Sequence, residues 1–530
     1  MKFKKILSLL SIFFILNGAL FSCDSSSIDY DEIEEKEIND NYRSIYQIMP
    51  YSYSDSNGDG IGDIQGIIDK VDYIKSLNYT GIWLTPVHPS ETYHKYDVDD
   101  YYNIDSTFGT LEDYDNLVCK LHVNNMTMLL DLVVNHSSDS NPWFYKCLNA
   151  HRNKQTTNQY YNYYNVRELN SGESVPAGYT KNGTLIYESR FWSGMPDLNL
   201  QNVLDEPDGY LATELKNIFK FWLCDHEVDG FRLDAVTSYF TGDQDRNKQF
   251  LTWLNDECKK IKPDCYIVGE GSWDSPQENA RYQESGVDSF FMFSNQSAKG
   301  YVSQITMGDG SFYPYALKKN KEIANGGIEA PFVSNHDTGH MIGCVKGRSD
   351  VNNIKFAHGV LALLNGTTFT YYGDEMGLAV PSGTNGQDED KRLPIDFGDE
   401  YTCEPVSNHS DYTYDDIYPY GSVKDQLKNK NSLVNYVKKA NLLRKQFLEI
   451  ARGEFSEVYT SQDETFSVVS KTYNNHTIYI LLNASISKSF DYDFSELGNV
   501  KPLQELCCKG SCKLKNNVIT VPFKGIAILG

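Results

Sequence analysis

From about residue 43 onward, the chain alternates short apolar segments that predict strands with amphipathic segments that predict helices. Residues 64–77, for example, carry apolar side chains at helical spacing. Most strand segments are apolar at nearly every position, which is typical of parallel strands buried on both faces. Eight β/α repeats predict an α/β fold, a (β/α)8 TIM barrel. The expected strands are residues 44–50, 81–84, 128–134, 230–234, 266–269, 288–293, 331–334 and 367–372.

Two parts of the chain do not follow this alternation. Residues 137–196, rich in Asn, Tyr, Gly and Ser, are too long for an ordinary loop, and we expect an inserted domain there. After residue 452, segments of alternating polarity predict an antiparallel β-domain, a β-sandwich at 453–530. The barrel itself is then expected at residues 43–136 and 197–452. The strands expected in the last domain are residues 466–471, 477–482 and 518–523.

The N-terminus has the plan of an export signal. Three lysines precede an apolar run at residues 6–20, which is short for a transmembrane helix. The sequence LFSC that follows resembles a bacterial lipobox, which predicts a signal peptide at 1–22 and lipid on Cys23. Residues 23–42 are Ser-rich and then acidic, and we expect a flexible tether. The expected location is a membrane-anchored lipoprotein, periplasmic or on the cell surface, with plain secretion as the alternative.

The net charge and the cysteine pattern argue against nucleic acid and zinc as ligands of this chain. The formal net charge is −24, which repels phosphate backbones, so no nucleic-acid partner is expected. The 11 cysteines are spread along the chain, and Cys507, Cys508 and Cys512 are their only cluster. This cluster lacks a second ligand pair at zinc spacing. A disulfide involving one of these residues stays open, because connectivity cannot be read from sequence.

One predicted strand carries charge on a single side. In residues 229–235 (DGFRLDA), Phe231 and Leu233 alternate with Arg232 and Asp234. Residues two apart on a strand project to the same face. The guanidinium can therefore hold the carboxylate ionised and aimed, as a nucleophile requires. For this segment alone, a purely structural Arg–Asp pair explains the pattern equally well.

Polar side chains also follow other predicted strands. Any one of them alone is explained by a capping role or a satisfied core group. Because barrel enzymes build active sites at the carboxyl ends of their strands, the whole set indicates a shared pocket. The residues are Tyr96 and Asp97 after the second strand, Asn135 and His136 after the third, Glu270 after the fifth, and Asn335, His336 and Asp337 after the seventh.

In this order, these motifs resemble those of the α-amylase family of glycoside hydrolases (family 13). The resemblance extends from about residue 43 to the C-terminus, and the combination of motifs is highly specific. The matching segments are Asp131 with Asn135-His136, Gly230-Phe231-Arg232-Leu233-Asp234, Gly269-Glu270, Asn335-His336-Asp337, Met195-Pro196-Asp197-Leu198-Asn199 near the end of the family's inserted domain B, and Gly373-Asp374-Glu375 after the eighth strand.

The resemblance implies that Asp234 is the nucleophile, Glu270 the general acid/base and Asp337 the stabiliser of the transition state. Retaining glycosidases use two carboxyls about 5–5.5 Å apart, one attacking the anomeric carbon and one protonating the leaving oxygen. Glu270 follows an apolar strand, an environment that raises a carboxyl pKa and keeps its proton available. The implied substrate-binding residues are Tyr96, Asp97, His136, Arg232 and His336.

Residues 55–63 (DSNGDGIGD) carry oxygens at alternate positions around glycines. Such a turn can bring hard oxygen ligands round one calcium ion, although no glutamate follows at the EF-hand position. A subset of the resembled family binds a structural Ca²⁺ in this loop; a solvated acidic turn is the alternative. The implied ligands are the side chains of Asp55, Asn57, Asp59 and Asp63 and the carbonyl of Ile61.

Departures from the family bear on specificity. Thr237 and Ser238 stand where many α-amylases carry Lys-His, which leaves a second family calcium site open. We expect a monomeric enzyme that hydrolyses α-1,4-glucosidic bonds of starch-like α-glucans or maltooligosaccharides. An exo-acting α-glucosidase or oligo-1,6-glucosidase and a glucan transferase are the rivals within the family. A decayed sugar-binding scaffold would have lost one of the three carboxylates, and all three are present.

Overall fold

The computed structural model describes residues 26–271, 275–347, 350–379, 387–406 and 412–530. The expected signal peptide and Cys23 lie outside these residues, so their assignment stays a prediction. No helix within the described ranges is long and apolar enough to cross a membrane.

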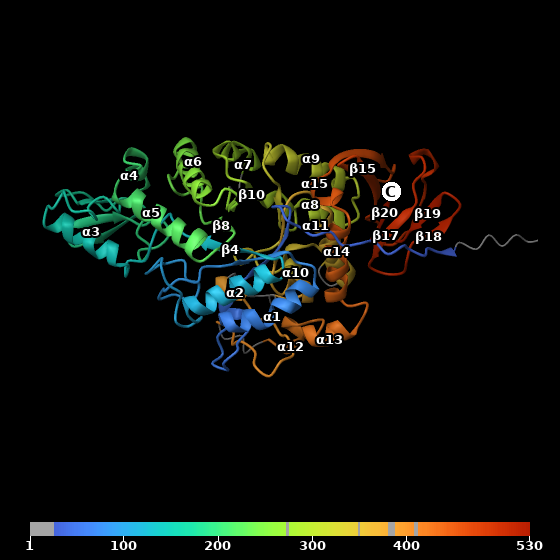
Figure 1. Ribbon diagram of the computed structural model, residues 1–530, viewed down its shortest axis with the longest axis horizontal. Coiled ribbons are helices and arrows are strands. Elements are labelled where there is room, and N and C mark those ends of the chain that lie inside the picture. Colours follow the sequence, from blue (N-terminus) through green and yellow to red (C-terminus); the bar gives the residue numbers. More distant parts are fainter. Residues whose placement is uncertain (1–25, 272–274, 348–349, 380–386, 407–411) are drawn as a thin grey trace, which may run out of the picture.

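The centre of the molecule is a barrel of eight parallel strands (Figure 1). Their order around the barrel follows the chain, and a bridge between Phe332 and Phe369 joins β11 to β12. The predicted (β/α)8 TIM barrel is therefore confirmed. The strands are β2 (Ser44–Ile48), β3 (Gly81–Leu84), β4 (Thr127–Leu132), β8 (Gly230–Leu233), β9 (Tyr266–Gly269), β10 (Ser289–Met292), β11 (Ala330–Pro331) and β12 (Thr368–Tyr371).

Helices cover the outside of the barrel, so its strands are buried on both faces, and β3 and β9 read as continuous apolar runs. The predicted helix at residues 64–77 is α1, which begins where the Asp63 side chain accepts from the Gly66 N–H. The longer helices are α1 (Ile64–Ser76), α2 (Leu111–Val123), α5 (Tyr210–Lys220), α6 (Gln244–Ile261), α9 (Phe312–Ala324), α11 (Val351–Leu363) and α14 (Leu433–Gln446). The shorter ones are α4 (Leu200–Asp205), α7 (Pro276–Tyr282), α8 (Tyr301–Thr306), α10 (Met341–Cys344), α12 (Tyr414–Ile417), α13 (Val423–Lys428) and α15 (Glu449–Arg452).

The long connection after β4 has structure of its own. It contains α3 (Pro142–Arg152) and an antiparallel sheet in the order β5-β7-β6. Bridges from His136 to Asp197 and from Tyr164 to Leu198 hold the region against the barrel. In Figure 1 this region lies at the opposite end of the molecule from the C-terminal domain. The strands are β5 (Val166–Glu168), β6 (Tyr179–Asn182) and β7 (Leu185–Glu188).

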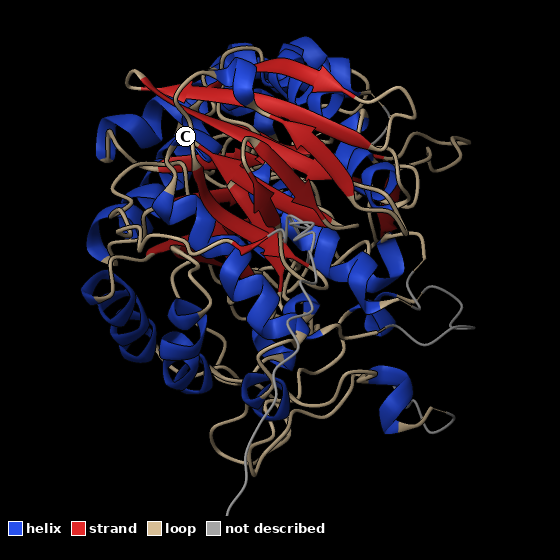
Figure 2. Ribbon diagram, turned by 90° about the vertical axis from the view of Figure 1, so that its right-hand side faces the viewer, coloured by secondary structure: helices blue, strands red, loops and turns tan. Residues whose placement is uncertain are grey.

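After α15, two antiparallel sheets pack face to face, as predicted for the C-terminal part (Figure 2). Apolar residues of both sheets meet between them, including Phe466 and Leu481 from one sheet and Ile519 and Val521 from the other. The five-stranded sheet holds β13 (Glu454–Thr460), β14 (Phe466–Tyr473), β15 (His476–Asn483), β20 (Gly525–Leu529) and β17 (Pro502–Cys507). The four-stranded sheet holds β1 (Ser26–Ser27), β18 (Lys513–Lys515), β19 (Val518–Val521) and β16 (Phe490–Asp493).

The N-terminal segment corrects one prediction. Residues 26–42, expected to be a flexible tether, lie against the folded body (Figure 1). β1 pairs with β18, the Tyr30 hydroxyl donates to Glu505 at 3.0 Å, and Ile38 is buried. Composition does not predict this docking, because a few apolar side chains and one strand pairing are enough to hold an acidic segment on an existing sheet edge.

Candidate active site

A cavity of about 570 Å³ opens at the carboxyl ends of the barrel strands. It brings together residues that are far apart in sequence, because the ends of parallel strands meet on one face of a barrel. Five residues predicted for the site line it: Tyr96, His136, Asp234, Glu270 and Asp337. The other lining residues are His94, Phe191, Trp192, Met195, Ala235, Thr237, Ser238, Gly271, Asp388 and Arg392.

Arg232 lies beneath the cavity floor and organises its carboxylates. The side chain is fully buried, and its guanidinium carbon lies 5.2 Å from the centre of the Trp83 ring and 5.8 Å from that of the Tyr96 ring. One guanidinium nitrogen donates to Asp234 at 2.8 Å, and the other donates to Glu270 at 3.0 Å. Two carboxyls bonded to one planar guanidinium must lie side by side. This is the arrangement that a pair of cooperating carboxyls needs.

A third carboxylate completes the network below the floor. Both oxygens of Asp131 accept from Arg232, at 2.8 and 3.0 Å. Burial raises the pKa of Asp131 to about 7, against the lowering effect of the arginine. The single guanidinium therefore faces more carboxyl groups than it can neutralise, which favours a proton on one of them.

The pKa of Glu270 is raised to about 8. Burial is the main cause; the Arg232 charge opposes it, and the negative charges of Asp234 and Asp337 add to it. The Glu270 Oε2 atom also accepts from the Ala235 N–H at 3.2 Å. Glu270 thus holds a proton at neutral pH while facing the cavity, which suits a proton donor.

Asp337 lies on the wall of the cavity, with the Arg392 guanidinium and the His336 ring behind it. Its carboxylate accepts from Arg392 at 3.1 Å and lies 3.3 Å from the Nε2 atom of His336. Burial alone would raise the pKa of Asp337, but His336 and Arg392 lower it below its ordinary value. The cavity therefore presents an ionised carboxylate on this wall and a protonated one at Glu270.

Two histidines predicted to bind substrate occupy different positions. The His136 ring lines the cavity, and its Nε2 atom has no hydrogen-bond partner among the described residues. His336 lies behind the wall, where its ring nitrogens pair with Gln47 and the Tyr96 hydroxyl, both at 2.7 Å. Burial lowers the pKa of His136 and lowers that of His336 to about 3, so both rings are neutral.

The structure does not place every predicted substrate-binding residue at the cavity. Arg232 and His336 touch lining residues but do not line the cavity themselves. Asp97 is buried, and its carboxylate accepts from the hydroxyls of Ser90 and Thr92 within its own loop. Arg232 and His336 therefore position lining residues from behind, whereas Asp97 holds its own loop together.

Several lining residues were not predicted from sequence. Phe191 and Trp192 are each 53% exposed at the cavity, and the Phe191 ring lies 5.4 Å from that of His136. The sequence signal that could have indicated these two residues is a pair of large aromatics in a Gly- and Ser-rich segment. Arg392 donates to Tyr93 at 2.7 Å and to Asp337, and it comes from a region without a recognised motif.

The predicted calcium loop forms a tight turn after β2. Its acidic side chains accept from the loop's own N–H groups: Asp55 from Gly58 at 2.6 Å and Gly60 at 2.8 Å, and Asp63 from Ser56 at 2.9 Å. The carboxylate oxygens of Asp55, Asp59 and Asp63 do not all lie within 4.8 Å of one another. The donor set of hard oxygens fits calcium, but side-chain rotation is needed to bring them round one ion.

Sequence and structure comparisons relate the chain to known proteins. The family model "Alpha amylase, catalytic domain" matches residues 47–453. "Alpha-amylase 3" of Dictyoglomus thermophilum is 30% identical over 489 residues, covering 91% of this chain and 92% of that protein. "Oligo-1,6-glucosidase" of Parageobacillus thermoglucosidasius is 28% identical and covers 83% of this chain and 89% of that protein. The solved structure "Eubacterium rectale Amy13B" superposes with a TM-score of 0.84 at 33% identity, covering 94% and 97% of the two chains.

Proposed function

The chain belongs to the α-amylase family of glycoside hydrolases, and we propose that it is a retaining enzyme that hydrolyses α-1,4-glucosidic bonds of starch-like α-glucans or maltooligosaccharides. One observation carries this proposal. A single buried guanidinium holds Asp234 and Glu270 side by side on the cavity floor, and the Glu270 pKa is raised while Asp337 stays ionised on the wall. Such a set supplies a nucleophile, an acid and a fixed negative charge.

In the proposed first step, the Asp234 carboxylate attacks the anomeric carbon. A bond forms between that carbon and the Asp234 oxygen as the bond to the glycosidic oxygen breaks. Glu270 gives its proton to the departing oxygen, so the sugar leaves as an alcohol. Asp337 stabilises the positive charge that develops on the ring.

In the second step, water replaces the departed sugar. Glu270, now a carboxylate, takes a proton from the water, and the oxygen of the water bonds to the anomeric carbon. Asp234 leaves as a carboxylate, and the product keeps the anomeric configuration of the substrate. The Tyr96 ring provides an apolar surface for a sugar face, and the neutral His136 ring offers its free Nε2 atom to a hydroxyl.

Two relatives point to different bonds. "Alpha-amylase 3" covers nearly the whole chain and supports α-1,4 cleavage, while the oligo-1,6-glucosidase relative keeps α-1,6 cleavage as the second candidate. The exposed Phe191 and Trp192 at the cavity favour the first, because they offer stacking surfaces for further sugars of a long chain.

Digestion of maltoheptaose, with chromatography of the products over time, tests the proposal. We expect internal products of several lengths at the earliest times. Glucose as the sole early product, or cleavage of isomaltose in preference, would favour the exo-acting 1,6-glucosidase. Products longer than the substrate would establish a transferase. No cleavage of any α-glucan by folded protein would refute the proposal.

We also propose that residues 55–63 bind a structural Ca²⁺ ion. Asp55, Asn57, Asp59 and Asp63 would supply side-chain oxygens and Ile61 its carbonyl, and the ion would stabilise the loop without taking part in catalysis. Excess chelator should then lower the melting temperature, and calcium, but not magnesium, should restore it. A melting temperature that is the same with and without chelator would leave the loop as a solvated turn.

Export and lipid attachment at Cys23 complete the proposed description. Cells grown with labelled fatty acid should yield a labelled protein, and Cys23→Ala should remove the label and release the enzyme from the membrane fraction. An unlabelled protein recovered in the culture medium would favour plain secretion.

A further inference from the structure

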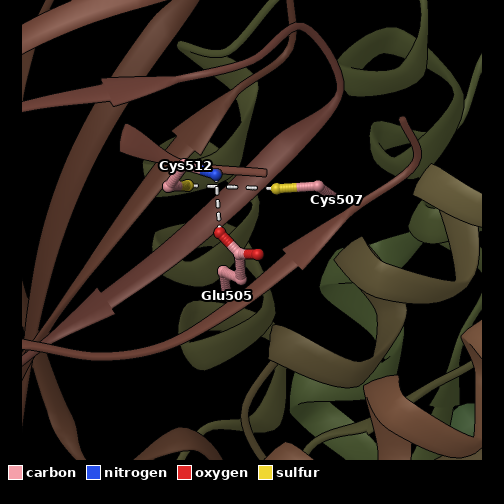
Figure 3. A group of neighbouring side chains, drawn as sticks. All are labelled: Glu505, Cys507 and Cys512. Atoms are coloured by element: carbon pink, nitrogen blue, oxygen red, sulfur yellow. Dashed lines mark hydrogen bonds between the residues drawn. The ribbon is translucent and has the colours of Figure 1, made fainter. Parts of the chain in front are cut away.

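The C-terminal domain contains a cluster of reactive side chains far from the cavity in sequence. In the described part of the chain, it is the one group of three His, Cys, Asp or Glu residues whose ligand atoms all lie within 4.8 Å of one another. The residues are Glu505, Cys507 and Cys512 (Figure 3). The two sulfurs are 3.9 Å apart, and the Cys512 N–H donates to Glu505 at 2.6 Å.

The two cysteines lie where the chain passes from one sheet of the sandwich to the other. Cys507 ends β17 in the five-stranded sheet, and Cys512 immediately precedes β18 in the four-stranded sheet. The turn between them includes Gly510 in the left-handed region, with φ of 75°. A covalent bond between the two sulfurs would therefore join the two sheets at their crossing point.

Strand geometry selects Cys507 rather than its neighbour Cys508. Adjacent residues of a strand point to opposite faces. Cys507 packs against the apolar cluster between the sheets, which includes Cys512. The Cys508 thiol points the other way and donates to the Asn352 carbonyl at 3.4 Å. Cys508 is therefore a natural control for Cys507.

The arrangement favours a dithiol over a metal site. Glu505 Oε2 already accepts from the Cys512 N–H and from the Tyr30 hydroxyl. With its other oxygen, Glu505 would bring the cluster to three protein ligands, whereas a structural zinc site takes four. To form a bond, the sulfurs need to approach from 3.9 Å to about 2.05 Å.

We propose that Cys507 and Cys512 form a reversible disulfide that staples the two sheets of the C-terminal domain beneath the N-terminal segment. The half-buried Cys507 lines a cavity of about 420 Å³ and is the first to react. Its thiolate attacks one sulfur of an incoming disulfide, such as oxidised glutathione, and expels the other half as a thiolate. The Cys512 sulfur then attacks Cys507 Sγ and expels the second half.

In balance, two protein thiols become one disulfide and the oxidant becomes two thiols. The order of attack agrees with the surroundings of the sulfurs. The hydrogen bond with Cys507 and burial raise the pKa of Cys512, so this thiol is slow to ionise on its own. It is therefore suited to the second, intramolecular step.

The disulfide would also stabilise the docking of the N-terminal segment. Tyr30 bonds to the same Glu505 oxygen that holds the Cys512 N–H, and β1 pairs with β18 directly after Cys512. Oxidation would fix the turn that carries both contacts. We expect residues 28–42 to be cleaved several-fold more slowly by protease in the oxidised protein than in the reduced one.

The test treats the full-length protein with oxidised glutathione, alkylates the remaining thiols and analyses the peptides by mass spectrometry. We expect a peptide in which Cys507 and Cys512 are joined and have lost two hydrogens. Cys507→Ser and Cys512→Ser should each abolish the linkage and the protection of residues 28–42. Cys508→Ser should keep both, and all three variants should keep their activity on maltoheptaose.

Because the wild-type protein alone reports the linkage, the test does not depend on how well a variant folds. Alkylation of both Cys507 and Cys512 after oxidation would overturn the proposal, as would a linkage of Cys507 to another cysteine. One equivalent of zinc that stays bound through dialysis and is lost in both serine variants would also overturn it, in favour of a metal site.

Discussion

Two buried arginines in this molecule have opposite surroundings. Arg232, beneath the cavity, is paired with carboxylates; we call it, with Asp131, Asp234 and Glu270, the arginine–carboxylate centre. Arg444, on α14, donates instead to the backbone carbonyls of residues 362, 364 and 366. Burial lowers the pKa of both side chains, but the carboxylates reverse this for Arg232 and raise its pKa.

Like Arg444, the buried Lys471 of β14 donates mainly to backbone carbonyls. Its ammonium group donates to the carbonyls of Leu363 at 2.8 Å and Ile450 at 2.7 Å and to Asn365 at 2.6 Å. Together, Arg444 and Lys471 form what we call the cation–carbonyl centre, which joins the barrel helices to the C-terminal domain. Burial and the Arg444 charge lower the pKa of Lys471.

The difference between the centres explains their separate uses. Carboxylates exchange protons and attack carbon. When several of them surround one cation, their pKa values become different from one another. Backbone carbonyls do neither, so cations that bond to them can only hold segments together. Changes at the first centre should therefore affect activity, and changes at the second should affect stability.

The largest expected effect separates the centres most sharply. Asp234→Asn should slow hydrolysis at least a thousandfold, a loss of about 4 kcal/mol of transition-state stabilisation, because an amide is no nucleophile. Melting temperature and rate on maltoheptaose are the measurements. Asp229→Asn is the matched control, since Asp229 lies at the other end of the same strand and bonds to His122 and the Met128 N–H, both at 2.8 Å. It should keep the rate. Near-normal turnover by folded Asp234→Asn would end the mechanism.

At the cation–carbonyl centre, Lys471→Met should lower the free energy of unfolding by about 2–4 kcal/mol, because buried acceptors lose their donor. The rate per folded molecule should stay unchanged. Urea unfolding and the rate together test this. Lys515→Met, at an exposed position of β18, should change neither. A stable Lys471→Met protein with reduced activity would contradict the division between the centres.

The pH dependence of kcat/KM tests the raised pKa at the arginine–carboxylate centre. Glu270 should stay protonated until pH approaches about 8, so the rate should fall on the alkaline side, about tenfold per pH unit above that value. The sign follows from the role: the proton that Glu270 donates is lost as pH rises. An alkaline limb near 4.5, the ordinary value for glutamate, would show that burial does not raise this pKa.

The smallest effect is expected at the exposed edge of the cavity. Trp192→Ala should raise KM for maltoheptaose about fivefold, near 1 kcal/mol, with little change in kcat, because a half-exposed ring contributes binding only. Tyr145→Ala removes an exposed ring of α3 outside the cavity and should change nothing. Equal effects of both variants would assign the loss to the inserted region in general.

Sequence reasoning reached most of the barrel and the centre of the site, for identifiable reasons. The apolar runs that end in Asp234 and Glu270 are local patterns, and a closed barrel has one face where such ends can meet. The docking of residues 26–42 could not be read in this way, because Tyr30 and Glu505 are far apart in sequence and neither carries a local signal. The hydrogen bond from Arg392 to Asp337 could not be read either, because Arg392 lies in a segment without a recognised motif.

By itself, the sequence determined the eight strands, the order of the motifs and the strand-end positions of Asp234, Glu270 and Asp337. Periodicity and strand polarity are properties of neighbouring residues, so they can be read locally. Tertiary structure alone decided which side chains face the cavity. Asp97 and His336 turn to nearby hydrogen-bond partners, Arg232 lies under the floor, and Phe191 and Trp192 enter from a distant segment. The partner to which a polar side chain bonds, and the loop residues that line the cavity, depend on segments that are remote in the chain and meet only in the folded protein.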